Sequence, residues 1–424
     1  MIKKIRISNF KSFKDLEIGL GNFNVLIGAN ASGKSNFIQI FKFLKDIAKF
    51  GLDNALSEQG GIEYLRNINI GSSKNFSLEV VSNREYRRAV EKGKKLIGIE
   101  TYEAIYKFAI KFRKKGKGFE IAEDKLTEKC NLVGLKKTRK GEIEEKEKLG
   151  SGEIITSNIN GRVKVEPNLP KELSIYDDDL LPHFIIDEDD LSPLFIREKR
   201  LKPKTLLLKT PLVFLSNIFN YISIYDFDPK LPKRATTIIG KAELEEDGRN
   251  LAIVLKNIIE NKEKERKLRN LVKDILPFVD TLDVEKFADK SLLFTLQESY
   301  TKKQALPASL ISDGTINITA LIIALYFETK LLTIIEEPER NIHPYLISKV
   351  TDMMKEASQR KQIIVTTHNP EIVKYAGIEN ILLISRNNDG FSTISRPYEK
   401  EEVRIFLQNE IGIEDLYAQN LLGA

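Results

Sequence analysis

The stretch "FNVLIGANASGKSNFIQIF" (residues 23–41) decides the fold class. It begins with a short, nearly continuous apolar run, which is typical of a strand covered on both faces. The segment "GANASGKS" comes next and fits the pattern G-x-x-x-x-G-K-[ST], and the residues after it take helical spacing. A buried strand, a glycine loop and a helix in this order predict an α/β fold of the P-loop NTPase type.

The predicted phosphate loop has one chemical task for each of its fixed positions. Gly28 and Gly33 let the backbone fold tightly, so that its N–H groups point at phosphate oxygens. Lys34 neutralises the β/γ charge, Ser35 offers a hydroxyl to Mg²⁺, and the following helix directs its positive end at the phosphates. The predicted loop contacts are Gly28, Ala29, Asn30, Ala31, Ser32, Gly33, Lys34 and Ser35.

A second apolar segment, "LLTIIEEPE" (331–339), ends in two adjacent carboxylates. Burying an unpaired carboxylate is costly, so a core strand that ends on two of them needs an explanation. Beside a phosphate loop, Glu336 is placed to hold Mg²⁺ through water, and Glu337 to orient or deprotonate the attacking water. The alternative is a helix N-terminus with favourable acidic residues before "PERNIHPYLI".

Two further motifs extend this constellation. "IIVTTHNP" (363–370) reads as a buried strand ending at His368, whose imidazole would contact the γ-phosphate. Taken alone, a histidine at a strand end has a structural role more often than a functional one. "LISDGTINITALIIAL" (310–325) places Ser312 and Gly314 just before a buried helix, which offers a second anion site. Read by itself, that motif is a capped helix.

Composition limits the class of protein. The chain has 424 residues, 42% hydrophobic and 30% charged, enough for one large domain or two ordinary ones. Its longest apolar run, residues 318–327, is far shorter than the ~20 residues of a membrane span. The single Cys130 excludes a disulfide framework and a multi-cysteine metal site. We expect a cytoplasmic protein without a membrane segment. Its net charge of +6 permits nucleic-acid binding without arguing for it.

The set of motifs carries a family resemblance. The order of these motifs is similar to that in the ABC-type ATPase heads of the RecF/SMC group. The order is a phosphate loop, S-x-G before a helix, a strand ending in two acids and a strand ending in His. The chain more closely resembles the stand-alone RecF-like AAA ATPases, relatives of the ATPase part of OLD-family proteins. The segments that carry this likeness are "IRISNFKSFKDLEI", "LIGANASGKSN", "LEEDGRNLAIVL", "SDGT", "IIEEPERNIHP", "TTHNP" and "IEDLYAQNLLGA".

The resemblance implies a homodimer with two nucleotides sandwiched between its heads. Ser312 and Gly314 of one copy would contact the γ-phosphate that Gly33, Lys34 and Ser35 of the other hold. The implied cofactors are ATP and Mg²⁺, with Ser35 and Glu336 as metal ligands.

The resemblance also assigns roles to single residues. Glu337 would be the general base and His368 the switch histidine, so the implied catalytic residues are Glu337, His368 and Lys34. Asn30 and Asn36 would flank the phosphates. The loop "RNIHP" would cross the dimer interface, with Arg340 or Asn341 communicating between the two sites.

Three departures from the transporter-type heads stand out. Glu336 occupies the position where those heads usually carry Asp, which puts the water geometry at the metal in doubt. "LISDGT" lacks the second glycine and the glutamine of their signature. The nearest candidate for their lobe-linking glutamine is Gln59 in "LSEQGG", and we do not favour it.

The motif positions predict four segments. Residues 1–81 and 306–424 would form the two parts of an ABC-type head with a mixed β-sheet core. Residues 82–210, with charge runs and strand-like pieces, would be an inserted mixed α+β lobe. Residues 211–305 would be a helical and strand lobe leading to the signature, with one helical stretch near 247–276.

The segment "YKFAIKFRKKGKG" (106–118) bears on nucleic-acid binding. Its apolar and basic residues alternate, so one strand face would be basic and would follow a phosphate backbone. The alternative is a solvated face or a lysine-protected edge strand. The apolar members are Tyr106, Phe108, Ile110 and Phe112, and the basic ones are Lys107, Lys111, Arg113, Lys114, Lys115 and Lys117.

The sequence therefore predicts an ATPase that dimerises around Mg-ATP and hydrolyses it slowly. It would act as a switch on DNA, in repair or anti-phage defence, or on a partner effector. Two alternatives stay open: the ATPase subunit of a membrane transporter, and an ATP-binding scaffold that controls a separate nuclease or toxin without touching DNA. The preference for adenine over guanine also stays open.

Overall fold

The computed structural model describes residues 1–424 except 84, 93–94, 114–117, 138–142, 171–198, 203, 210–217, 288–289, 302–303, 410 and 424. The chain forms two compact units that interleave along the sequence. One combines Met1–Leu20, Ser35–Asn220 and Arg386–Ile394 and is called the antiparallel unit below. The other combines Gly21–Lys34, Tyr221–Ser385 and Ser395–Ala424 and is called the parallel unit. The predicted division into four segments stays a prediction.

The parallel unit is built on a parallel sheet with strand order β11-β16-β17-β3-β18. Its strands are short, apolar and buried, as expected where helices cover both faces of a sheet. Since the strands are parallel, the residues that follow their carboxyl ends lie along one edge, where α/β sheets bind ligands. The bounds are β11 (Ile222–Tyr225), β16 (Leu332–Glu336), β17 (Gln362–Thr366), β3 (Phe23–Ile27) and β18 (Ile381–Arg386).

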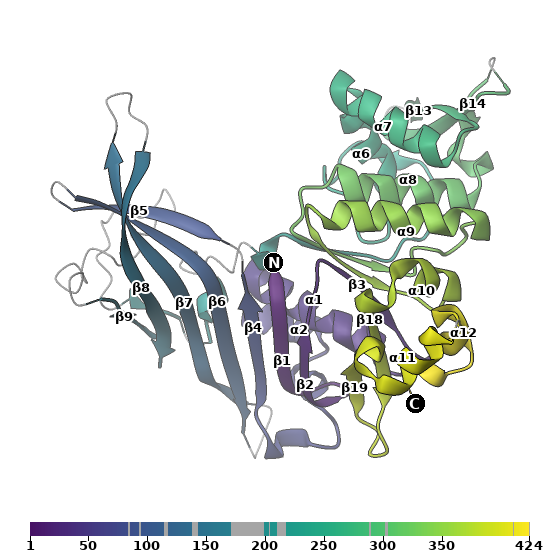
Figure 1. The fold of residues 1–424 in the computed structure, drawn as a ribbon. Coiled ribbons are helices and arrows are strands. Elements are labelled where there is room, and N and C mark those ends of the chain that lie inside the picture. The colour runs from purple at the N-terminus through teal and green to yellow at the C-terminus, as the bar shows by residue number, and fades with distance from the viewer. Residues whose placement is uncertain are drawn as a thin grey trace. The chain divides into compact units, whose positions relative to one another are not determined.

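Helices and a small antiparallel sheet complete the parallel unit. Figure 1 shows α8 and α9 side by side, with α6 and α7 beside β13 and β14. The sheet has the order β12-β14-β13, with β15 paired to β14. The helices are α6 (Leu251–Ile259), α7 (Lys262–Ile275), α8 (Asp313–Tyr326), α9 (Pro344–Ser358), α10 (Pro370–Ala376), α11 (Glu401–Gln408) and α12 (Ile413–Ala418). The strands are β12 (Thr236–Thr237), β13 (Val279–Phe287), β14 (Ser291–Glu298) and β15 (Leu306–Pro307).

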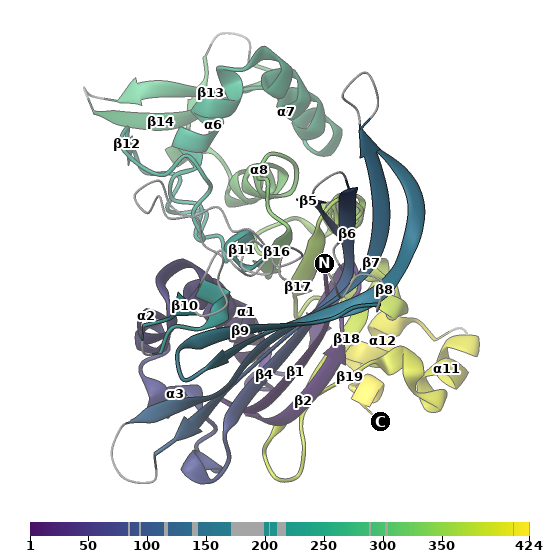
Figure 2. The same ribbon diagram turned by 90° about the vertical axis from the view of Figure 1, so that its left-hand side faces the viewer.

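The antiparallel unit is one large sheet with strand order β10-β9-β8-β7-β6-β4-β1-β2 and β5 paired to β6. Figure 2 shows the long, curved β6, β7 and β8. The strands are β1 (Ile2–Phe10), β2 (Phe13–Gly19), β4 (Phe76–Ser82), β5 (Tyr86–Lys92), β6 (Lys95–Phe112), β7 (Phe119–Lys137), β8 (Ile143–Ile159), β9 (Arg162–Asn168) and β10 (Lys199–Arg200). Its helices are α1 (Lys34–Phe50), α2 (Leu52–Glu58) and α3 (Ile62–Leu65), and β19 (Ser392–Ser395) lies at the unit boundary.

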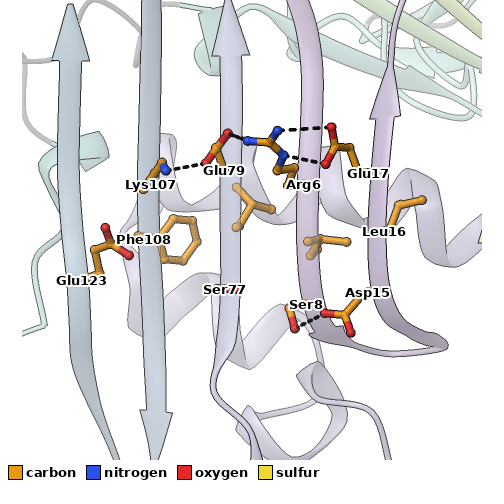
Figure 3. A pocket seen from close by; sticks show the side chains of 12 residues that line it. Arg6, Ser8, Asp15, Leu16, Glu17, Ser77, Glu79, Lys107, Phe108 and Glu123 are labelled. Carbon is orange, nitrogen blue, oxygen red and sulfur yellow. Dashed lines mark hydrogen bonds and ion pairs between the residues drawn. The ribbon is translucent and has the colours of Figure 1, made fainter.

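The two faces of this large sheet differ. On one face Phe43 of α1 packs against Phe10, Phe76 and Phe108, with ring centroids 5.9–6.5 Å apart. The other face carries a shallow hollow lined by ion-paired side chains (Figure 3), where Arg6 lies between Glu79 and Glu17. The alternation of apolar and polar residues therefore separates a packed face from a charged one.

The predicted P-loop α/β fold is confirmed, with two differences in detail. The helical stretch near 247–276 is two helices, because the Asn261 side chain accepts N–H bonds from Glu263 and Lys264 and starts α7 there. In the described part of residues 82–210, the regular structure consists of strands and one 3₁₀ helix, Leu207–Lys209. Much of the segment expected to be mixed lies outside the described residues.

Candidate active site

The phosphate loop joins β3 to α1 through left-handed backbone. Gly28 and Gly33 have φ values of +151° and +121°. A Cβ on Gly28 would lie 2.2 Å from the Ile384 carbonyl oxygen of β18, so only glycine fits there. The Lys34 Nζ donates to the carbonyl oxygens of Gly28 (2.8 Å) and Ala29 (3.1 Å). The ammonium group therefore lies over the loop.

The acidic strand β16 ends next to this lysine. Glu336 is its last residue, and Glu337 follows in a left-handed conformation with φ +43°. The Glu337 N–H bonds the carbonyl oxygen of Thr366 (2.9 Å), which extends the β16–β17 pairing into the turn. Burial lowers the pKa of Lys34, while the Glu337 carboxylate acts to raise it. The two charges are thus close enough to interact.

His368 lies at the end of the neighbouring β17. Its Nε2 is 4.0 Å from Glu337 Oε1. Burial lowers the pKa of His368, the Lys34 charge lowers it further, and Glu337 acts in the opposite direction. Burial and the Lys34 charge therefore favour the neutral form of the imidazole. The three predicted catalytic residues lie together at adjacent strand ends.

Glu336 lies in a partly buried region with an excess of negative charge. Burial, and then the negative charges of Asp226, Glu246 and Glu337, raise the pKa of Glu336 to about 7, while Arg340 acts to lower it. A cation would relieve this excess of negative charge, so the carboxylates at this edge fit the predicted metal ligand Glu336. In the described parts of the chain, no three or more His, Cys, Asp or Glu side chains form a metal-binding cluster by themselves.

The signature residues lie at the start of α8. The Ser312 Oγ accepts the Thr315 N–H (3.2 Å) and caps its own helix, and Ser312 is exposed. A Cβ on Gly314 would lie 2.6 Å from the Asn341 carbonyl oxygen, so α8 and the "RNIHP" loop meet at this glycine.

Other predicted residues have these positions. Ala29, Asn30 and Ala31 are exposed in the loop, and Ser32 is buried. The Asn36 amide donates to Ser12 Oγ (2.8 Å). Gln59 is buried and its amide donates to Gln39 (3.1 Å).

The strand face that was predicted to be basic carries acidic side chains as well. Tyr106, Phe108, Ile110 and Phe112 are buried as predicted. Lys107 pairs with Glu79 (2.7 Å) and Arg113 with Glu120 (3.4 Å), so neighbouring acids neutralise two of the six expected charges. Lys114, Lys115 and Lys117 lie outside the described residues.

Four residues near this candidate site were not predicted from the sequence. Asp226 directly follows β11, and Glu336 is the last residue of the paired strand β16. The apolar run "YISIY" before Asp226 could have predicted a buried strand that ends on a carboxylate. Glu246 lies in "LEEDGRN", which received no role. Glu339 accepts the Thr367 hydroxyl (2.5 Å) and the His368 N–H, and so supports the histidine turn. The Tyr417 hydroxyl of α12 bonds the Gly28 backbone. No local pattern points to these last two contacts.

Comparisons with known proteins show the family of this chain. The family model described as "AAA domain, putative AbiEii toxin, Type IV TA system" matches residues 23–95 and 179–374, more than half of the chain. The endonuclease GajA of Bacillus cereus (strain VD045) is 43% identical over 53 residues, which are 12% of this chain and 9% of GajA. The chain thus matches less than a tenth of that relative.

Solved structures of SMC head domains are also similar. The SMC head bound to the C-winged helix domain of ScpA has a TM-score of 0.45 at 16% identity, covering 93% of this chain and 97% of that one. The SMC head of Thermotoga maritima scores 0.39 at 13% identity, covering 93% and 98%. The Pyrococcus furiosus head scores 0.45 at 15% identity, covering 96% and 98%. Over the described residues, the helices are too short or too polar to cross a membrane.

Proposed function

The chain belongs to the AAA domain family described as "putative AbiEii toxin, Type IV TA system", and we propose that it binds Mg-ATP and hydrolyses it. The observation that carries this proposal is the grouping of Lys34, Glu337 and His368 at the ends of β3, β16 and β17. A cation over phosphates, a carboxylate beside it and a neutral imidazole are the parts that phosphoanhydride hydrolysis needs.

In this proposal each group has one role. The N–H groups of the loop and the Lys34 ammonium bind the phosphates. Ser35 and Glu336 would hold Mg²⁺, which would supply positive charge to offset the charge of the bound triphosphate. Glu337 accepts a proton from the attacking water, and His368 contacts the γ-phosphate.

We further propose a homodimer closed around two nucleotides. The support is the N-terminus of α8, where Ser312 is exposed and Gly314 is partly exposed. A second copy would bring its own phosphate to this end. The dimer would assemble on ATP and separate after hydrolysis.

The proposed output is control of a separate effector, with a nuclease as the first candidate because one relative is an endonuclease. The ion pairs of Lys107 and Arg113 favour this over direct DNA contact. A salt-dependent gel-shift assay with ATP discriminates between the two. No shift, or a shift that survives neutralisation of Lys111, Arg113, Lys114 and Lys115, supports the effector. A shift that those changes abolish supports DNA.

The ATPase proposal is tested with Glu337→Gln. We expect slow hydrolysis by the wild type and a decrease of about 10³-fold in the variant, because the general base is lost. The variant should still bind Mg-ATP and should elute as a stable dimer from size-exclusion chromatography with light scattering. Unchanged hydrolysis in this variant would show that the base is misassigned.

A further inference from the structure

The Arg340 guanidinium lies between two carboxylates of its own chain. Its Nε and Nη2 donate to Glu337 Oε2 (3.3 and 3.0 Å), and its Nη1 donates to Asp226 Oδ1 (2.9 Å). Sequence resemblance implied that Arg340 or Asn341 communicates across a dimer. The guanidinium instead contacts the base proposed for its own active site.

The backbone of Arg340 is fixed from two sides. Its N–H bonds the Glu337 carbonyl oxygen (3.0 Å), and its carbonyl oxygen accepts the Asn317 amide (2.6 Å). Asn317 lies on α8 and is only 3% exposed, so this bond is protected from water. The close approach of Gly314 to the Asn341 carbonyl holds the same loop against the first turn of α8.

This clamp distinguishes the two oxygens of Glu337. Oε2 is held by two N–H groups of Arg340, so the side chain cannot rotate freely. Oε1 is the oxygen on the side of His368, 4.0 Å from its Nε2. The Lys34 charge also acts on His368. The oxygen that Arg340 does not contact is therefore the one beside His368, the residue that the proposed function places at the γ-phosphate.

We propose that Arg340 is the positioning residue for Glu337 and that Asn317 ties this position to helix α8. Arg340 turns Oε1 toward the attacking water, and Asn317 keeps the Arg340 backbone in register with the helix that begins at Ser312. This inference rests on the proposed ATPase function. It adds a chain of hydrogen bonds within one copy of the protein, from Asn317 of α8 through Arg340 to the proposed general base Glu337.

A merely structural ion pair would behave differently. Arg340 and Asp226 are partly exposed, and exposed pairs contribute less than about 1 kcal/mol to stability. Losing such a pair would change the melting temperature slightly and leave kcat unaltered. A positioning role instead predicts a lower kcat with little change in KM.

The test measures kcat, KM for Mg-ATP, ATP affinity and melting temperature for Arg340→Lys, Arg340→Ala and Asn317→Leu. We expect kcat to fall about 10- to 100-fold in both Arg340 variants, because a small misplacement of a reacting group costs that much. KM and ATP affinity should stay near the wild-type values. Added guanidinium at low concentration should partly restore Arg340→Ala and leave Arg340→Lys unchanged. Asn317→Leu should lower kcat less.

The matched control is Arg360→Ala, which removes a surface pair with Glu356 on α9 (3.8 Å) and should leave kcat unchanged. If Arg340→Ala does not fold, Arg340→Lys decides, because it keeps the charge and most of the volume. Three results would overturn the inference. They are a wild-type kcat in Arg340→Lys, a kcat above the wild-type value in Arg340→Ala, and a raised KM with unchanged kcat. If Glu337→Gln is fully active, the proposed function fails instead. If it is inactive while the Arg340 variants are normal, only this inference fails.

Discussion

Two glutamates on the two sheets show opposite electrostatics. On the antiparallel sheet, hydrogen bonds from Arg6 and then Lys4 lower the pKa of Glu17 to about 2. At the end of the parallel sheet, burial and three neighbouring acids raise the pKa of Glu336 to about 7. The first carboxylate has its counter-ions in place across the strands, whereas the second is surrounded by like charge.

The difference separates charges that support the fold from charges that serve a ligand. In the antiparallel unit, Arg6, Glu79 and Lys107 pair across β1, β4 and β6 and match their register (Figure 3). In the parallel unit, an acidic excess that remains in the free protein lowers stability unless a cation arrives. This difference supports the proposal that the active site lies at the ends of the parallel strands and not on the long sheet.

The largest expected effect is that of Lys34→Ala. The variant removes the only charge of the phosphate loop, and we expect ATP affinity to fall by about 100-fold or more, since charge-assisted contacts to phosphate are strong. Isothermal titration calorimetry with Mg-ATP measures this, with Lys107→Ala as the control in the antiparallel unit. If the two variants bind Mg-ATP with equal affinity, the proposal that only the parallel unit carries the charge that binds the nucleotide is contradicted.

Gly314→Ala tests the contact between α8 and the "RNIHP" loop. The new Cβ would meet the Asn341 carbonyl oxygen at 2.6 Å, so one of the two must move. We expect a stability loss of about 1–3 kcal/mol and reduced hydrolysis with ATP binding retained. Denaturant unfolding and steady-state kinetics check this. Wild-type stability together with wild-type turnover would count against the close packing.

Glu336 gives a pH dependence with a definite sign. Its pKa in the folded protein, about 7, is above its ordinary value of 4.5, so folding disfavours the ionised form. The contribution of Glu336 to stability is therefore greatest below pH 4.5 and is lost as the pH rises through 7. In metal-free protein, we expect the melting temperature to fall more steeply between pH 5 and 7 in the wild type than in Glu336→Gln, because only the folded state still holds this proton there. Parallel curves would contradict the acidic excess.

The smallest effects are expected on the antiparallel sheet. Arg6→Gln and Lys107→Gln remove exposed or half-exposed partners whose interactions salt screens. We expect unchanged ATP hydrolysis and a small decrease in melting temperature that disappears at high salt. A large loss of hydrolysis in either variant would mean that this sheet takes part in the reaction.

The sequence predicted the residues whose roles follow from local order. The phosphate loop, the acids after β16 and His368 after β17 each end an apolar strand, so their shared edge follows from parallel pairing. Asp226 could not be placed this way. It joins Glu336 only because β11 pairs with β16, whose residues are more than a hundred positions further along the chain.

Other features depend on side-chain geometry that no pattern encodes. The hydrogen bond from Asn317 to Arg340 joins helix α8 to the loop after β16. These two segments have no sequence motif in common that would predict the contact. The left-handed Glu337 conformation was equally hidden, since glutamate has no preference for it. In the insert, alternation predicted the strand through Tyr106 and Phe112, but its length of 18 residues is set by pairing with β7.

The central claim is that the charged edge of the parallel sheet is a Mg-ATP site. A crystal structure of Glu337→Gln with Mg-ATP tests it most directly. We predict the triphosphate within Gly28–Ser35, the metal beside Ser35 and Glu336, and the γ-phosphate facing Gln at position 337 and His368. A structure with nucleotide bound elsewhere, or with this loop empty at saturating Mg-ATP, would contradict the account.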